Sequence, residues 1–255
     1  YIPDPNGAFI SYNINTGERF INTNIYGSRN IYLDLDQLLP KSRVIIKYNS
    51  RQDFQGTKPS LSRIFHPKIK DSSIVKSGIF DRLEILLPNF GRSKIWLDRN
   101  DLLNGMDPRG NERNNNRKFG LELNQDISKT YAIRYIATST SFSFESKISS
   151  LRDRSFSGWM NDCILRVTFN ELIDSDLGVI FGSNSGSHHE RPFDAIALGA
   201  KISTKALLNS KGRFESELNY VKVKSNDAKY ELPPESFEGY LEGGNFRINA
   251  RVQYF

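Results

Sequence analysis

The stretch Gly243–Phe255, GGNFRINARVQYF, decides the fold that we expect for this chain. Its apolar residues alternate with polar or basic ones, which is the period-2 pattern of a β-strand with one apolar face and one hydrated face. An aromatic carboxy-terminus after such a strand suggests the closing strand of an outer-membrane β-barrel. A half-buried strand of a soluble β-sandwich would show the same alternation, because the pattern does not tell whether lipid or a protein core covers the apolar side.

Length and composition fit a single all-β domain. The chain has 255 residues, of which 38% are hydrophobic, and its mean hydropathy is −0.51. No run approaches the ~20 apolar residues that a spanning helix needs, which excludes a helical membrane protein. A β-barrel stays possible, because it places only alternate residues against lipid.

Cysteine usage and charge narrow the function classes. The single cysteine, Cys163, cannot form an internal disulfide and lies in an alternating run, so we interpret it as a small apolar side chain. The net charge of +6 would suit an anionic partner such as nucleic acid or the phosphates of lipid A. The basic residues are scattered rather than clustered, which favours a solvated or lumenal distribution over nucleic-acid binding.

The plainest break in the pattern is Asn104–Arg117, NGMDPRGNERNNNR, where turn-forming pairs are followed by three consecutive asparagines. We therefore expect residues 1–103 to hold amino-terminal strands and loops of the barrel or a small β subdomain. Residues 104–117 are expected to form a loop, and residues 118–255 a set of regular antiparallel strands. Polar composition predicts further loops at Asn49–Ser77 and Gly182–Arg191.

The strands after residue 117 are the most regular part of the sequence. Their spacing predicts seven or eight strands near the ~10 residues that a tilted strand needs to cross hydrocarbon, and ten to fourteen in the whole chain. The apolar parity flips within Thr138–Ser141, which predicts a bulge or a turn there. The fold class that we expect is an antiparallel up-and-down outer-membrane β-barrel, with a β-sandwich as the alternative.

The hydrated positions of these strands are mostly basic. A charge that faced lipid would cost about 2–4 kcal/mol at the midplane, so the alternation has a physical reason to be strict. We predict a basic interior that acts as an anion-selective lumen or binds an acidic plug, or else a closed interior whose arginines pair with loop acids such as Glu215 and Glu217. The predicted lumen-facing basic residues are Lys118, Arg134, Arg166, Lys201, Lys205, Arg247 and Arg251.

Residues that could carry chemistry are few. The sequence His188-His189-Glu190 is the one concentrated metal-type cluster, and in an extended segment His188 and Glu190 would share a side while His189 points away. They are weak metal candidates, and a polar loop is the favoured interpretation of the cluster. No Ser-His-Asp arrangement has a recognisable local context, so we expect neither an enzyme nor a cofactor.

The chain resembles the carboxy-terminal region of very large surface proteins of Gram-negative bacteria, from the group that uses gliding and type IX secretion. The resemblance rests on YIPDPNG at residues 1–7, LLP at 38–40, IFHP at 64–67, and LP at 232–233 leading through EGGNF at 242–246 into a strand. It implies a β-barrel or an extended β-sheet at the cell surface, carries no catalytic residues, and implies a further strand or two after Phe255. The turn-rich opening in place of a secretory signal indicates a mature product or a piece of a longer chain.

Three functional hypotheses follow from the sequence, and the third and least favoured is an enzyme on a barrel scaffold, which no motif supports. The first is an outer-membrane β-barrel that acts as a membrane anchor or conduit, with membrane lipid, lipopolysaccharide and other subunits of a larger surface or secretion assembly as partners. The second is a soluble secreted β-sandwich that binds glycan or forms a surface fibre through its exposed strands.

Overall fold

The computed structural model describes residues 2–3, 9–10, 23–35, 43–88, 93–107, 109–170, 172–209, 212–226 and 232–254. Long strands dominate this part of the chain, with three short helical segments in the connections. The elements are β1 (Ile2–Pro3), β2 (Phe9–Ile10), β3 (Thr23–Asp34), β4 (Ile45–Gly56), α1 (Leu61–Phe65), β5 (Ile74–Leu87), β6 (Ser93–Asn104), β7 (Glu112–Asp126), β8 (Tyr131–Ser146), η1 (Ser150–Arg152), β9 (Arg154–Asn170), β10 (Ile173–His188), β11 (Arg191–Asn209), β12 (Gly212–Ser225), η2 (Ser236–Gly239) and β13 (Gly243–Tyr254).

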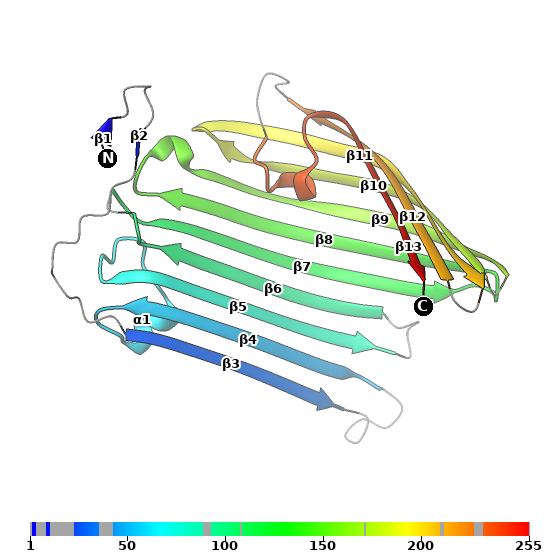
Figure 1. The fold of residues 1–255 in the computed structure, drawn as a ribbon, viewed down its shortest axis with the longest axis horizontal. Helices are drawn as coiled ribbons and strands as arrows, with labels where there is room; N and C mark the ends of the chain where they lie inside the picture. Colours follow the sequence, from blue (N-terminus) through cyan, green and yellow to red (C-terminus); the bar gives the residue numbers. More distant parts are fainter. Residues whose placement is uncertain are drawn as a thin grey trace.

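Eleven strands, β3 to β13, form one antiparallel sheet in which each strand pairs with its neighbours in the sequence. This confirms the expected all-β, up-and-down architecture and a strand number between ten and fourteen. The sheet is open, because its two edges are β3 and β13. Figure 1 shows that β3 to β9 form a broad wall and that β11 to β13 curl over one side of it. Closure into a barrel therefore stays a prediction.

The register of the pairs gives the sheet two chemically different faces. Residues that lie directly opposite in an antiparallel pair point to the same side. The strand partners Ile248, Leu218, Ile202, Leu177 and Leu165 thus form one apolar row across β13 to β9. We call their side of the sheet the apolar face and the opposite, concave side the polar face.

The two ends of the sheet differ in how the chain reverses. At one end the connections are residues 57–73, 105–111, 147–153, 189–190 and 226–242, and we call this the loop end. At the other end the chain passes from β3 to β4, β5 to β6, β7 to β8, β9 to β10 and β11 to β12, and we call this the turn end. The longer connections of the loop end supply both segments that fold back onto the sheet.

Residues 232–242, which we call the inturned segment, pack on the polar face near the loop end. Phe237 and Tyr240 of this segment join a buried cluster with Phe142, Phe156 and Val221 from three different strands. Phe142 and Phe156 stack with ring centroids 5.2 Å apart. Figure 1 shows η2 of this segment lying inside the curl of the sheet. A second, smaller cluster of Phe54, Ile74 and Leu103 lies on the other face, where Ile64 of α1 packs against it.

Three predicted loops are shorter than expected. The connection after β6 spans only residues 105–111, because residues 112–117 belong to β7, and the sheet continues across the expected boundary between residues 1–103 and 118–255. The expected loop Asn49–Ser77 is reduced to residues 57–73, and Gly182–Arg191 to the turn His189–Glu190. In each case the strand continues into the polar segment. Beyond the apolar rows, both faces of the strand carry polar or small residues such as serine, asparagine and glycine.

The parity flip in β8 needs no bulge, contrary to expectation. The register of β8 with both neighbours is unbroken from Tyr131 to Phe144. Toward the turn end its apolar residues lie on the apolar face, and toward the loop end Phe142 and Phe144 lie on the polar face against the inturned segment. The burying partner changes sides along the strand, so the hydrophobic pattern changes sides with it.

Candidate functional site on the polar face

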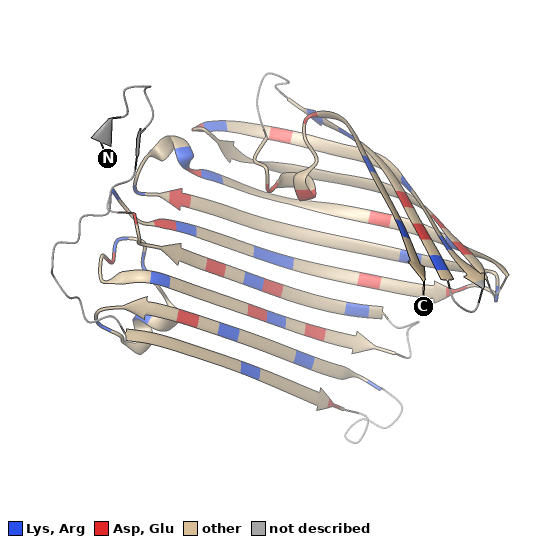
Figure 2. Cartoon of the chain, in the orientation of Figure 1, with Lys and Arg blue, Asp and Glu red and all other residues tan. Residues whose placement is uncertain are grey.

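The strand register brings all of the predicted basic residues to one face of the sheet. Arg134 is opposite Ile164, which is two residues from Arg166 and therefore on the same side of β9. Lys201 and Lys205 are four residues apart in β11 and point to this same side. Lys118 belongs to β7, and Arg247 and Arg251 to β13. Figure 2 shows that Lys and Arg positions are interspersed with Asp and Glu positions along the strands. Because the sheet is open, the enclosure of a lumen by this face stays a prediction.

Acidic residues of the strands accompany the basic ones, which the sequence did not lead us to expect. Arg134 Nε donates to Glu122 Oε1 at 2.7 Å, and Lys94 Nζ lies 3.0 Å from Glu122 Oε2. Arg166 Nε donates to Asp176 Oδ1 at 2.8 Å. Lys201 Nζ lies 3.1 Å from Glu217 Oε1. Glu215 and Glu217 are in β12 rather than in a loop, so the prediction that loop acids pair with the arginines was wrong in its location.

Five of the predicted basic residues line one recess of about 540 Å³ between β8 and β13. Asp176, Glu215 and Glu217 line it as well. Within the described residues, no ion pair is found for Lys205 or Arg251. The recess therefore carries an excess of positive charge and two cations that can meet a mobile anion. The basic lining residues are Arg134, Arg166, Lys201, Lys205 and Arg251.

The remaining predicted residues lie elsewhere on the same face. Arg247 holds the inturned segment: its Nη2 donates to the Glu238 carbonyl oxygen at 2.9 Å, and its guanidinium lies 3.9 Å from the centre of the Tyr240 ring. Lys118 lines a separate recess of about 490 Å³ over β3 to β7, together with Tyr26 and Phe80. The predicted basic residues thus lie in three different places on this face: the basic recess, the contact with the inturned segment, and the recess over β3 to β7.

The inturned segment narrows the space above the polar face. Arg154 Nε donates to Glu235 Oε2 at 3.0 Å, which ties the start of the segment to β9. Phe237 and Glu238 have left-handed backbone angles, with φ of 46° and 54°. Such angles cost non-glycine residues about 1–2 kcal/mol each, so the surrounding contacts must hold the segment in place. Burial raises the pKa of the Tyr240 phenol, which keeps it neutral over the ordinary pH range.

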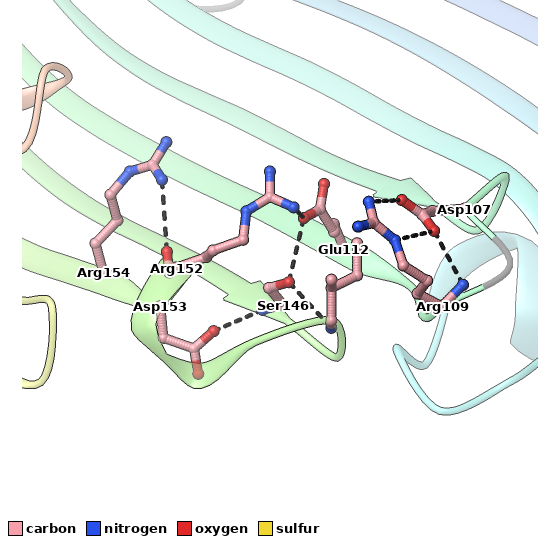
Figure 3. Close-up of polar contacts among 8 residues, drawn as sticks. Asp107, Arg109, Glu112, Ser146, Arg152, Asp153 and Arg154 are labelled. Carbon is pink, nitrogen blue, oxygen red and sulfur yellow. Dashed lines mark hydrogen bonds and ion pairs between the residues drawn. The ribbon is translucent and has the colours of Figure 1, made fainter. Parts of the chain in front are cut away.

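Polar contacts also tie the connections of the loop end together. Figure 3 shows that Arg152, Ser146 and Glu112 meet between η1 and the start of β7. Arg152 Nη1 lies 2.5 Å from Glu112 Oε1, and Ser146 Oγ donates to the same oxygen at 3.1 Å. In the neighbouring connection, hydrogen bonds from Arg109 lower the pKa of Asp107 to about 2. Ion pairs and hydrogen bonds therefore hold both connections of this rim.

The metal candidates His188 and Glu190 are used differently from the prediction. The strand ends at His188 and a turn follows, so the rings of His188 and His189 stack with centroids 3.9 Å apart instead of pointing to opposite sides. Glu190 Oε1 accepts from Ser150 Oγ at 2.6 Å. In the described part of the chain, no group of three or more His, Cys, Asp or Glu side chains is arranged to hold a metal ion.

Replacing Glu122 with glutamine should destabilise the folded protein by about 1–3 kcal/mol, the range for hydrogen bonds to charged groups. The side chain of Glu122 is 9% exposed and accepts from Arg134, Lys94 and Asn124, so the neutral variant leaves two cations poorly matched. Chemical denaturation of the purified protein measures the effect. Glu84→Gln removes a weaker ion pair at 3.5 Å to Arg82 and is the control. Equal midpoints for the two variants would contradict the assignment of Glu122 as the centre of this network.

Comparison with known proteins adds no relative. No protein-family model, no curated protein and no solved structure matches the chain. Within the residues that the structure describes, no helix is both long and apolar enough to cross a bilayer. Any assignment of function consequently depends on the chemistry of the two faces.

Proposed function

We propose that this chain forms part of the wall of an outer-membrane β-barrel, which serves as a membrane anchor or conduit within a larger cell-surface or secretion assembly. The observation that carries the proposal is the exposure of the apolar face. Leu198, in a strand that is paired on both sides, is 63% exposed, and Ile248, in the edge strand β13, is 71% exposed. Soluble monomers rarely expose apolar patches larger than a few hundred Å², and this one runs across most of the sheet.

Aromatic residues border the apolar face at two levels, which supports lipid as its surroundings. Near the loop end, the Trp159 and Phe181 rings meet edge to face at 5.9 Å, and the Tyr220 and Phe246 rings lie 5.5 Å apart. Near the turn end the apolar face ends at aromatic residues again. These are Tyr131, Phe169, Phe214 and Tyr254.

The separation of the two aromatic levels matches a bilayer. Along β9, Trp159 and Phe169 enclose a length of strand of about 33 Å at ~3.3 Å per residue. At the ~40° tilt of barrel strands this corresponds to roughly 25 Å, which is the height of the apolar band of outer-membrane barrels. Beyond Trp159 and Phe181 toward the loop end, the same face carries serines, as expected for strands that leave the bilayer. They are Ser139, Ser141, Ser143, Ser155, Ser157, Ser183, Ser185 and Ser187.

Closure of this wall follows a simple rule. Because β3 and β13 are separated by an even number of antiparallel steps, they run in the same direction. An all-antiparallel barrel therefore takes an odd number of additional strands between them. In the proposed assembly those strands lie outside the eleven-stranded sheet, and the polar face with its basic recess lines the interior.

The proposal predicts that the folded protein requires detergent and migrates differently on gels before and after boiling. A closed barrel resists unfolding by detergent without heat, so the unboiled sample should run at a different apparent mass. Electrophoresis of paired boiled and unboiled samples, with sedimentation in the absence of detergent, makes the measurement. A folded protein that stays soluble without detergent and shows no heat-dependent shift would instead favour a β-sandwich, in which a second layer covers the apolar face.

A further inference from the structure

We propose that Arg117, with Arg99 and Arg113, binds the phosphate group of a membrane lipid whose acyl chains lie along Leu97 and Phe119. The proposal rests on the proposed function, since it needs the apolar face to meet lipid. It adds a specific binding site and a lipid class, namely lipids with an anionic phosphate headgroup.

The first step is the placement of two arginines at the border of the apolar face. Arg117 of β7 and Arg99 of β6 are direct cross-strand partners, so their side chains leave the sheet side by side on the same face. The next pair toward the turn end is Leu97 and Phe119, which are 49% and 51% exposed. A headgroup at the arginines would therefore place its acyl chains on this exposed apolar surface.

The second step is the local charge balance. Arg113 binds Asp101 with two hydrogen bonds, from Nε at 2.9 Å and Nη2 at 2.7 Å, and Asp101 is fully buried. Arg99 lies 3.5 Å from Asp101 and 3.9 Å from Asp81. Glu145, the strand partner of Arg113 on β8, lies on the same face, so three carboxylates surround Arg99 and Arg113.

Arg117 is the one of these three arginines for which no contact with a carboxylate is found in the described part of the chain. It is exposed, and no ion pair is found for it within the described residues. Like charges directly opposite on adjacent strands destabilise a sheet, unless an anion lies between them. A phosphate group supplies that anion and matches the geometry of two guanidinium groups.

The third step distinguishes a lipid phosphate from other anions. The arginines lie on the apolar face, which is the reverse of the face that carries the basic recess, and Ser141 directly opposite Arg117 on β8 offers a hydroxyl at the same level. Anionic lipid headgroups attract basic residues at the membrane surface, at about 1 kcal/mol each. An anion moving along the polar face would not reach this site.

The test compares Arg117→Gln with Lys222→Gln, which removes the same charge from the same face on β12. Each variant is purified in neutral detergent, and binding of phosphatidic acid, phosphatidylcholine and inorganic phosphate is measured by native mass spectrometry or titration. We expect Arg117→Gln to weaken the binding of phosphatidic acid about 10-fold and Lys222→Gln to change it less than about 2-fold. Arg117 is exposed, so its variant should keep the heat-dependent gel shift.

Three outcomes would overturn the site. Equal loss of binding in the two variants would indicate general attraction between charges, and equal binding of phosphatidic acid and phosphatidylcholine would exclude a role of the phosphate charge. Binding of inorganic phosphate as tight as that of the lipid would assign the arginines to free phosphate. Absence of the gel shift in the unmodified protein would instead contradict the proposed barrel itself, so the two failures are distinguishable.

Discussion

Replacing Ile248 with arginine should block stable insertion into the membrane, whereas the same change at the next residue, Asn249→Arg, should be tolerated. Ile248 lies on the apolar face and is 71% exposed, between the aromatic levels that Phe246 and Tyr254 mark on the same strand. An arginine that faces lipid near the midplane costs about 2–4 kcal/mol. Asn249 points to the polar face and lies opposite Glu217, where a new guanidinium group gains a partner.

The effect should also depend on depth. Leu198 lies on the same face but directly opposite Phe181, at the loop-end border of the apolar band, where the cost of a charge falls to about 0–1 kcal/mol. Leu198→Arg is therefore expected to reduce insertion less than Ile248→Arg does. The fraction of protein that resists urea extraction from membranes and shows the gel shift measures all three variants. Normal insertion of Ile248→Arg, or an equal defect in Asn249→Arg, would show that the faces are assigned wrongly.

The sequence predicted the strands well because one physical rule governs most of them. Where one side of a strand is apolar and the other hydrated, alternation of residue types follows directly, as in β13 from Phe246 to Tyr254. The placement of all of the predicted basic residues on one face has the same origin. Their individual roles did not follow, because the partners Glu122, Asp176 and Glu217 come from strands whose register is fixed only in the folded sheet.

The loop end was harder to predict because its contacts are distant in the sequence. Phe142 packs with Phe237, which lies in a connection that the sequence marks only as proline-rich and polar. A signal was present, since Phe237 and Tyr240 are large aromatic residues within an otherwise loop-like stretch, and β12 carries Val221 and Val223 on the face that is polar elsewhere. Reading those features together would have predicted a connection folded against the polar face.

Phe237→Ala should release the inturned segment from the polar face while the eleven-stranded sheet remains intact. The side chain of Phe237 is 2% exposed and packs in the buried cluster with Phe142 and Val221. Truncation of a buried phenylalanine costs about 3–5 kcal/mol. The segment is also held by Leu232 and Tyr240 in the same cluster and by polar contacts such as Arg154–Glu235 and Arg247–Glu238. Two of its residues have left-handed backbone angles, so we expect the loss of the Phe237 ring to loosen it.

The measurement is hydrogen exchange of the amides of residues 232–242, with Leu241→Ala as the matched control. Leu241 belongs to the same segment but is 61% exposed, so its truncation removes little packing. Exchange in the segment should accelerate in Phe237→Ala alone, and amides of β8 to β10 should stay protected in both variants, because the strand hydrogen bonds are untouched. If the chain acts as a conduit, the same variant should also raise single-channel conductance in planar bilayers, since the displaced segment no longer narrows the space above the polar face near the loop end. Unchanged exchange in Phe237→Ala would mean that the remaining contacts of the segment, and not the Phe237 ring, hold it in place.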